Sequence, residues 1–331
     1  MSLILTMQGF NGTYSQTTAG SQKFRVMFYN VENLFDTYND PKKQDDEFLP
    51  DGQMRWNNSK YYTHLRKTAQ VINAIGEWGT PAVCGLCEVE NDTVIVNLLN
   101  RTPLREQHYS YCITTGSDAR GINNALLYQR DKFKYLGHAS RRIYFTNKAK
   151  RSRDILHVWG KIINGEQLDV FVCHFPSRSS GVQETEQDRM DAAKYLKKLC
   201  DSLLQDNLNA NILIMGDFND TPEDRSMQFI KKGTNPKYNL VNLFEDAEKL
   251  NFHGSHKFQG EWSQLDQMFV SQHLKKMLAE GSNLIFAPDF LLTKKNRKGE
   301  QSVFRNYAGV AYKGGFSDHL PIVADFLFPI K

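Results

Sequence analysis

Two short polar motifs, each at one end of an apolar strand-like run, constrain this chain more than any other feature. Residues 216–219 read Gly-Asp-Phe-Asn and follow the apolar run 211–215, and residues 317–321 read Ser-Asp-His-Leu-Pro and precede the apolar run 322–326. Each motif sets a carboxylate beside a second polar group. Carboxylates bind hard cations, and imidazoles with an Asn stabilise the charge that develops on a phosphate. The two motifs therefore indicate a metal-assisted phosphoester-cleaving site at the ends of buried strands.

Apolar and alternating runs elsewhere in the chain predict many strands. Residues 155–163 and 168–174 flank the pair Asn164-Gly165, which favours the type I′ turn of a β-hairpin. The other predicted strands cover residues 23–29, 82–89, 110–114, 124–128, 142–145, 211–215, 265–270 and 322–326.

Helical spacing of apolar residues predicts four helices between these strands. They cover residues 60–78, 92–100, 184–205 and 222–231, and Asp92 is the expected N-cap of the second helix. Strands outnumber helices and occur in pairs as well as singly. We therefore expect two packed sheets with outer helices rather than the regular alternation of a Rossmann fold.

Length and charge set broad limits on function. The 331 residues carry a net charge of +4, which permits an anionic substrate without requiring nucleic acid. No apolar run reaches about 18 residues, so no transmembrane segment is expected. No obligate protein partner is evident, and an exported or periplasmic location fits the sequence as well as a cytoplasmic one. We assign residues 1–22 to a flexible N-terminal tail (a tag or the remnant of a signal) and residues 23–331 to a single domain.

Six polar clusters lie at or near predicted strand ends and form the candidate site. Taken singly, each has an ordinary structural interpretation, because Asn and Asp close turns and a strand-end acid or imidazole is often a surface residue. Their joint occurrence favours a common site on a rigid sheet core. The clusters are Asn30 with Glu32, Glu88, His174, Asp217 with Asn219, Asp266, and Asp318 with His319.

These clusters belong to motifs through which the chain resembles the endonuclease/exonuclease/phosphatase superfamily, with its DNase I-like fold. The motifs are Tyr-Asn-Val-Glu-Asn at 29–33, Cys-Glu-Val-Glu at 87–90, Cys-His-Phe-Pro-Ser at 173–177, Gly-Asp-Phe-Asn at 216–219, Leu-Asp-Gln-Met-Phe at 265–269 and Ser-Asp-His-Leu-Pro at 317–321. The resemblance covers residues 23–328. It implies an α/β (α+β) fold, a four-layer α/β/β/α sandwich of two packed mixed sheets with outer helices, and a site at one end of the sheets.

The resemblance also implies a divalent cation, Mg²⁺ in the first place, with Mn²⁺ or Ca²⁺ as alternatives. Glu88 is the expected main ligand of this cation. Glu32 and Asp318 are the further expected metal ligands, although Glu32 stands where many relatives carry Asp. By similarity, Asn30 helps to position the Glu88 carboxylate or the phosphate.

The remaining site residues are expected to act on the phosphate itself. By resemblance, Asp217 and Asn219 face the scissile phosphate, and His174 binds a non-bridging oxygen or protonates the leaving group. Asp266 is expected to orient His319 through its second ring nitrogen, which fixes the tautomer. The sequence leaves two candidates for the general base, namely Asp217 and the pair of Asp266 and His319.

Loops decide substrate choice on such a fold, and their sequences give weaker evidence. Ser177 and Arg178 follow His174 directly and, with Asn124, are the candidate substrate-binding residues. The loop 146–154 contains four basic residues, which suit a nucleic-acid backbone but also an ordinary solvated loop. A second basic run covers residues 294–298.

The sequence therefore predicts a Mg²⁺-dependent phosphoester hydrolase. The favoured substrate is a nucleic acid, DNA or RNA, cut by in-line attack of water, as in a nuclease or phosphodiesterase. The alternatives are a phosphomonoesterase and a phospholipid- or inositol-type phosphoesterase. A catalytically silent binding module is least favoured, because Glu88, Asp217 and His319 are all present.

Overall fold

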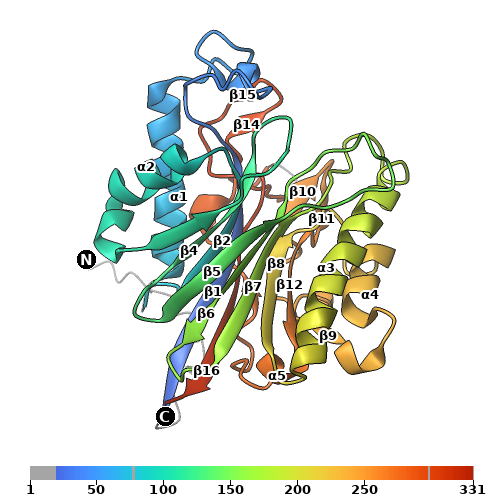
Figure 1. Ribbon diagram of the computed structural model, residues 1–331. Helices are drawn as coiled ribbons and strands as arrows, with labels where there is room; N and C mark the ends of the chain where they lie inside the picture. The colour runs from blue at the N-terminus through green and yellow to red at the C-terminus, as the bar shows by residue number, and fades with distance from the viewer. Residues whose placement is uncertain (1–19, 77–78, 297–298, 331) are drawn as a thin grey trace, which may run out of the picture.

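The computed structural model describes residues 20–76, 79–296 and 299–330, which form two six-stranded sheets packed face to face (Figure 1). The first sheet has the order β13 (Leu284–Ile285), β16 (Ile322–Pro329), β1 (Ser21–Leu34), β2 (Val83–Val89), β4 (Asn123–Tyr128) and β3 (Ser110–Ile113). The second has the order β5 (Phe133–Arg141), β6 (Ile155–Ile162), β7 (Gln167–His174), β8 (Asn211–Asp217), β12 (Asp266–Ser271) and β9 (Leu240–Asn242).

Helices cover the outer face of each sheet. Figure 1 shows α1 (Asn58–Ile75) and α2 (Asp92–Asn100) on one side of the molecule and α3 (Glu186–Asp206) and α4 (Arg225–Lys232) on the other. The short helix α5 (Gln272–Lys275) follows β12. Two small ribbons, β10 (His256–Phe258) with β11 (Glu261–Ser263) and β14 (Tyr307–Ala308) with β15 (Ala311–Tyr312), complete the fold. The layers run helix, sheet, sheet, helix, so the predicted four-layer sandwich is confirmed.

Both sheets are mixed, and each contains one parallel pair near its centre. β1 pairs with β2 in parallel and with β16 in the antiparallel sense. β7 pairs with β8 in parallel, and β8 pairs with β12 in the antiparallel sense. The carboxyl ends of β1, β2, β7 and β8 consequently meet at one end of the sandwich.

The two sheets approach closely at the centre of the core. A Cβ atom at Gly85 of β2 would lie 2.9 Å from the sulfur of Met215 on β8, so a side chain there would displace the Met215 side chain from the space between the sheets. A Cβ at Gly216 would lie 2.4 Å from the Cys173 carbonyl oxygen of β7, and only glycine fits. The glycine of the Gly-Asp-Phe-Asn motif therefore secures the β7–β8 pairing that carries the motif.

The outer helices bury one apolar face each. Leu65, Ala69 and Ile72 of α1 belong to the same buried cluster as the strands of the first sheet. A separate cluster joins α3 and α4 to the outer face of the second sheet and contains Leu196 and Phe171. Fully burying one such side chain contributes roughly 1.5–3 kcal/mol, so the two clusters fix the helices on their sheets.

Most predicted elements are present, with a few corrections. The strand predicted at 142–145 is wrong, because these residues lie in a loop, and the strand before that loop is β5, Phe133–Arg141. β5 is an edge strand in which only Phe133 is buried, so it lacks the apolar alternation from which a strand is predicted. Helix α1 ends at Ile75 with Gly76 as its C-cap, and α2 is capped by Asn91, which accepts from Val94 N, rather than by Asp92.

The N-terminal boundary also changes. β1 begins at Ser21, and Ser21 and Gln22 pair with β16, so two residues of the predicted tail 1–22 belong to the sheet. Residues 1–19 lie outside the described part of the chain. Within the described residues no helix combines the length and apolar character needed to span a membrane.

Candidate active site

The polar motifs converge where the central strands of both sheets end. His174 is the last residue of β7 and pairs with Asp217, the last residue of β8, which in turn pairs with Asp266 at the start of β12. Asn30 lies on β1 beside Cys87 of β2. The segment that carries Asp318 and His319 leads into β16. Side chains from both sheets therefore share one small space.

The backbone is distorted at this end of the sandwich. The β1–β2 register shifts between Asn30 and Leu34, and the β2–β4 register shifts between Cys87 and Val89. Four site residues, Glu32, Asn33, Glu88 and Asn219, have φ between 52° and 62°, the left-handed region that non-glycine residues rarely adopt. Such conformations persist where the surrounding structure enforces them, and they cluster at functional sites. The bulge at Glu88 turns its carboxylate out of the strand and into the site.

Asn30 links the two carboxylates at the centre. Its side-chain Nδ2 donates to Asp217 Oδ2 over 3.0 Å and lies 3.3 Å from Glu88 Oε1. The other oxygen of Glu88 accepts from the Asn33 backbone N–H at 2.8 Å, and Asp217 Oδ1 accepts from the Asn219 N–H at 2.9 Å. Burial raises the pKa of Asp217 to about 7, although the charge of His319 opposes that rise.

His174 directs one ring nitrogen at both carboxylates. Its Nε2 lies 3.7 Å from Glu88 Oε1 and 3.7 Å from Asp217 Oδ2. The pKa of His174 is held well below its usual value, first by burial and then by the positive charges of Arg153 and Arg120. The ring is therefore neutral at pH 7.

His319 has the opposite protonation state. Its Nδ1 is 2.7 Å from Asp266 Oδ2, and its Nε2 is 3.7 Å from Asp217 Oδ2. Burial lowers the pKa of His319, but the charges of Asp266 and Asp217 outweigh burial and hold it well above its usual value. The structure thus places Asp266 where it accepts from Nδ1–H and leaves Nε2 facing the centre.

The donor set around Asp217 suits a hard cation. The ligand atoms of Asp217, Asp266 and His319 lie within 4.8 Å of one another, and Glu88 stands at the mouth with a side chain that is 15% exposed. The second oxygen of Asp266, Oδ1, is buried and has no hydrogen-bond partner among the described residues. Carboxylate oxygens are the ligands that Mg²⁺ prefers. The carboxylates of this set could hold such an ion, whereas the charged His319 ring has no free lone pair for a metal.

Glu32 is placed differently from its predicted role as a metal ligand. Its two carboxylate oxygens accept from the backbone N–H groups of Asn306 and Tyr307, at 2.7 and 3.0 Å. Burial and the nearby charge of Asp318 raise the pKa of Glu32 to about 8. Both oxygens are thus engaged in anchoring a loop. Asp318 is half-buried and pairs with Arg305 at 2.9 Å, so a metal would compete with that guanidinium.

The predicted substrate-binding residues also have other partners. Arg178 donates to Asp220 at 2.9 Å, to Asp224 at 2.6 Å and to the Asn219 carbonyl, so its guanidinium holds the turn after β8. Asn124 is fully buried and donates to the Asp154 carbonyl, which keeps it away from any substrate. The structure therefore assigns both residues to the scaffold.

Ser177 and Asn219 are closer to their predicted setting. Ser177 is exposed in the loop after His174 and accepts from Ser179 N at 3.2 Å. The Asn219 side-chain amide donates to the Phe175 carbonyl at 3.2 Å, and the residue remains half-buried beside Asp217.

Three residues near the centre were not identified from the sequence. Arg153 is buried and donates to the Phe175 carbonyl, directly after His174, and its charge acts on His174, Glu88 and Asp217. Arg120 is half-buried, and its guanidinium lies 3.4 Å from Asn33 Oδ1. Arg153 was predicted only as one of four basic residues in a loop, and no local pattern separates it from its neighbours.

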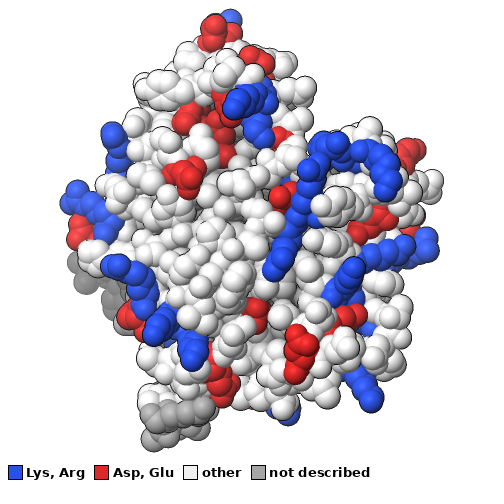
Figure 2. Space-filling view, in the orientation of Figure 1, with Lys and Arg blue, Asp and Glu red and all other residues white. Residues whose placement is uncertain are grey.

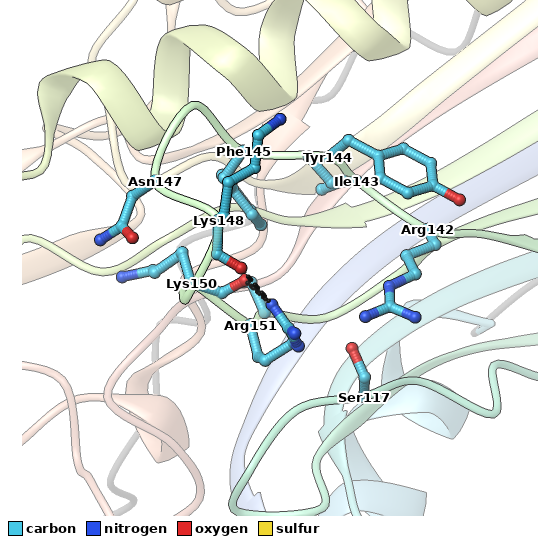
Figure 3. Close-up of a pocket in the computed structure, with 10 residues that line it drawn as sticks. Ser117, Arg142, Ile143, Tyr144, Phe145, Asn147, Lys148, Lys150 and Arg151 are labelled. Carbon is cyan, nitrogen blue, oxygen red and sulfur yellow. Dashed lines mark hydrogen bonds between the residues drawn. The ribbon is translucent and has the colours of Figure 1, made fainter.

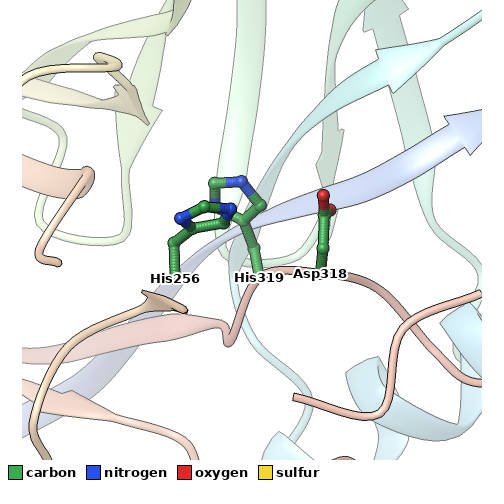
Figure 4. Close-up of side chains that lie close together, drawn as sticks. All are labelled: His256, Asp318 and His319. Atoms are coloured by element: carbon green, nitrogen blue, oxygen red, sulfur yellow. The ribbon is translucent and has the colours of Figure 1, made fainter. Parts of the chain in front are cut away.

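The third is His256, which packs against His319. The two ring centroids are 4.6 Å apart, and the ligand atoms of His256, Asp318 and His319 lie within 4.8 Å of one another (Figure 4). Burial and the charge of His319 lower the pKa of His256 to about 4. This neutral ring covers one side of His319. Its sequence neighbours form no motif, so only the β10 bridge to residue 319 identifies it.

Comparison with known proteins agrees with this arrangement. The model of the Endonuclease/Exonuclease/phosphatase family matches residues 25–327. The chain belongs to this family. Family members hydrolyse phosphoester bonds, so the protein is a phosphoester hydrolase by class. No curated protein matches the sequence.

Solved structures of family members share the fold at low sequence identity. The catalytic domain of human Nocturnin with bound sulfate matches at 16% identity and TM-score 0.58, over 92% of this chain and 93% of that one. Truncated TDP2 from Caenorhabditis elegans matches at 16% and 0.58, over 92% and 98%. The mannosyl-6-phosphatase Bt3783 from Bacteroides thetaiotaomicron matches at 17% and 0.58, over 92% and 99%. At such identities the likeness concerns the fold.

Proposed function

We propose that the protein is a Mg²⁺-dependent phosphodiesterase that cuts nucleic acid by in-line attack of water. One observation carries the proposal. His174 comes from the second sheet and His319 from the segment that leads into β16 of the first sheet, and their Nε2 atoms each lie 3.7 Å from the same oxygen, Asp217 Oδ2. The two nitrogens are therefore no farther apart than twice that distance, a gap that one phosphate group bridges by hydrogen bonds.

The protonation states suit unequal roles for the two imidazoles. Charged His319 donates from Nε2 to an oxygen of the phosphate, where negative charge grows in the transition state. Neutral His174 donates from Nε2 to a second oxygen, because its proton can reside there. Asp217, with a pKa of about 7, accepts the proton of the attacking water near neutral pH. This assigns the base to Asp217 and leaves Asp266 to orient His319.

The metal is assigned to Glu88, whose side chain is 15% exposed. Mg²⁺ bound there supplies Lewis-acid polarisation of the phosphate. Asn30 fixes the carboxylates of Glu88 and Asp217 through one amide, so it holds the donor set in place. Glu32 does not bind the metal in this assignment. It anchors residues 305–307, and Arg305 of this segment pairs with Asp318.

A phosphomonoesterase is the second candidate, and one observation favours it. A structural relative that covers nearly all of this chain is named as a mannosyl-6-phosphatase. Against it stand the basic side chains of the loop 146–154, since a polyanionic substrate gains more from such charge than a sugar monophosphate does. A phospholipid- or inositol-type substrate has no comparable support in the described residues.

Parallel assays separate these candidates. Purified protein is tested with Mg²⁺ and with EDTA on plasmid DNA, RNA, bis(p-nitrophenyl) phosphate and p-nitrophenyl phosphate. The proposal expects metal-dependent cleavage of a nucleic acid and of the chromogenic diester, with the monoester far slower. Preference for the monoester would establish the phosphomonoesterase, and no metal-dependent turnover of any ester would remove the catalytic assignment.

A further inference from the structure

A small cationic pocket lies between Ser117 and the β5–β6 loop and takes no part in the chemistry described above. It has a volume of about 60 Å³ and is lined by Ser117 and by residues of the loop 142–152 between β5 and β6. One water needs only about 10–15 Å³ of such volume, so the pocket has room for a group of several heavy atoms. Figure 3 shows Arg142, Arg151 and Ser117 pointing into the same space, whereas the amines of Lys148 and Lys150 point away from it.

The polar groups of this pocket match an anion. Arg142 is exposed and makes no hydrogen bond or ion pair with another described residue, although its charge acts on the carboxyl group of Asp154. Arg151 is exposed and donates from one guanidinium nitrogen to the carbonyls of Lys148 and Lys150. Its other guanidinium N–H groups remain available to a ligand. Ser152 also lines the pocket. Ser152 is only 5% exposed, and its buried hydroxyl has no hydrogen-bond partner among the described residues. An oxyanion would satisfy these donors together.

The pocket is coupled to the active centre through its two walls. Ser152 precedes Arg153, whose guanidinium donates to the carbonyl oxygen of Phe175, the residue after His174. Ser117, on the opposite wall, precedes Asp118, which pairs with Arg153 at 3.6 Å. Each wall is thus one residue from the ion pair that borders the catalytic centre. This connection is the ground for placing a group bound in the pocket next to the scissile phosphate of the same substrate.

Surface features point to a nucleotide chain as the molecule that supplies this anion. Figure 2 shows Lys and Arg side chains in an arc where Figure 1 places the β5–β6 loop. Tyr144 lines the pocket with a ring that is 73% exposed and meets Tyr195 of α3 edge-on at 6.5 Å. Basic side chains beside an exposed aromatic ring form the usual platform for single-stranded nucleic acid, with phosphate on the cations and a base on the ring.

We propose that Ser117, Arg142, Arg151 and Ser152 bind a phosphate adjacent to the scissile one in a single-stranded oligonucleotide, with Tyr144 as a stacking surface for its base. The assignment rests on the proposed phosphodiesterase function. It also gives the basic residues between β5 and β6 three different roles. Arg142 and Arg151 bind substrate, Arg153 supports the catalytic centre, and Lys150 is held by Asp188 at 3.0 Å.

Binding is measured first, without metal, so that the result does not depend on turnover. Fluorescence anisotropy of labelled hexathymidylate is followed over a range of salt concentrations. Replacing Arg142 or Arg151 by Ala should each weaken binding about tenfold, because a charge-assisted contact is lost. Each replacement should also flatten the slope of log K against log salt by about 0.7. Tyr144→Ala should weaken binding about tenfold or more, whereas Tyr144→Phe should not, because stacking needs only the ring.

Lys148→Ala is the matched control, since it removes a positive charge from the same loop at a side chain that points away. It should change affinity less than twofold, because separated surface charges are largely screened by salt. Steady-state kinetics on two substrates provide a second, independent measurement. Arg142→Ala with Arg151→Ala should raise KM for hexathymidylate and leave hydrolysis of bis(p-nitrophenyl) phosphate unchanged, because that small diester has no second phosphate.

The outcomes distinguish the subsite from the activity it serves. Unchanged hexathymidylate binding in the arginine variants, or an equal loss in Lys148→Ala, would overturn the subsite. Equal loss of rate on both substrates would also overturn it, because the arginines would then support the centre itself. Arginine-dependent binding without any Mg²⁺-dependent turnover would leave the subsite standing and remove the phosphodiesterase.

Discussion

His174 and His319 are both buried, yet their surroundings drive their pKa values in opposite directions. Arg153 and Arg120 add to burial at His174, whereas Asp266 and Asp217 outweigh burial at His319. We expect His174→Ala and His319→Ala each to lower kcat by at least ~10²-fold, the scale of a lost acid–base or transition-state contact. Steady-state kinetics on the chromogenic diester measure this loss. A variant that keeps more than a tenth of the wild-type rate would exclude its histidine from the chemistry.

Asp266 pairs with Nδ1 of His319, and we propose that it acts through this ring, so its replacement should have a distinct kinetic signature. Asp266→Asn should lower kcat roughly 10²-fold or more while KM stays nearly constant, because the imidazole loses its orientation and not its contact with substrate. Removing the carboxylate charge also lowers the pKa of His319. The alkaline limb of the pH–rate profile should then move to lower pH. An unmoved limb would show that Asp266 does not control the proton of His319.

At the level of elements, the turn between β8 and α4 depends on Arg178. This guanidinium joins Asp220 to Asp224 and lies 25% exposed, and Asp220 keeps a second partner in Arg189. Arg178→Ala should therefore lower the free energy of unfolding by about 1–3 kcal/mol, the cost of leaving buried charge less well paired. Urea titration measures this change. The salt dependence of substrate binding should be unaltered. A flatter slope of log K against log salt would indicate that Arg178 does bind the substrate.

Helix α1 is tied to the segment before Asp318 by His64. Its Nε2 lies 3.1 Å from the Phe316 carbonyl oxygen, and its Nδ1 lies 3.3 Å from the Asn306 amide. Burial lowers the pKa of His64 from 6.5 to about 4 in the folded protein. Between those values the unfolded chain binds more protons than the folded one, so stability falls as the pH drops from 6.5 toward 4.

His64 should account for about 2 kcal/mol of stability lost between pH 7 and pH 5, given ~1.4 kcal/mol per pKa unit. Urea unfolding of wild type and His64→Gln at both pH values isolates this contribution from other titrating groups. The variant should be less stable at pH 7 and should lose less on acidification. Parallel pH dependences in the two proteins would show that His64 titrates normally.

Elements were predicted from the sequence where local pattern and environment agree. The β6–β7 hairpin, the helix α3 and the strand ends at Asp217 and His174 follow from apolar runs and turn residues. The edge strand β5 did not, because it has little buried surface to impose an alternation.

Individual roles at the site were predicted less completely, because they depend on partners distant in the chain. Arg178 was expected to bind substrate, and its partners Asp220 and Asp224 meet it only through the β7–β8 pairing. Arg153 and Lys150 lie in one basic run, yet one is buried beside His174 and the other pairs with Asp188. Sequence pattern gives the residue types at such positions, and burial decides what each one does.

At the scale of the whole molecule, the active centre exists because two sheets with separate outer helices end at the same place. His174 and Asp217 come from one sheet, and Asn30, Glu88 and His319 from the first sheet or the segment that leads into it. The clusters that hold the sandwich together are apolar. EDTA should accordingly abolish activity while the urea unfolding midpoint remains nearly unchanged, since a catalytic metal contributes little to such a core.

We assign the catalytic metal to Glu88, and the Mg²⁺ dependence of diester hydrolysis in Glu88→Gln tests this assignment. Glu90→Gln is the matched control. Burial raises the pKa of Glu90 to about 8, and this carboxyl accepts from Asp36 N at 2.6 Å, so a neutral amide replaces it well. We expect at least ~10²-fold loss of rate at saturating Mg²⁺ for Glu88→Gln, on the scale of lost transition-state stabilisation, and little change for Glu90→Gln. An undiminished rate in Glu88→Gln would rule out Glu88 as the ligand of the catalytic metal.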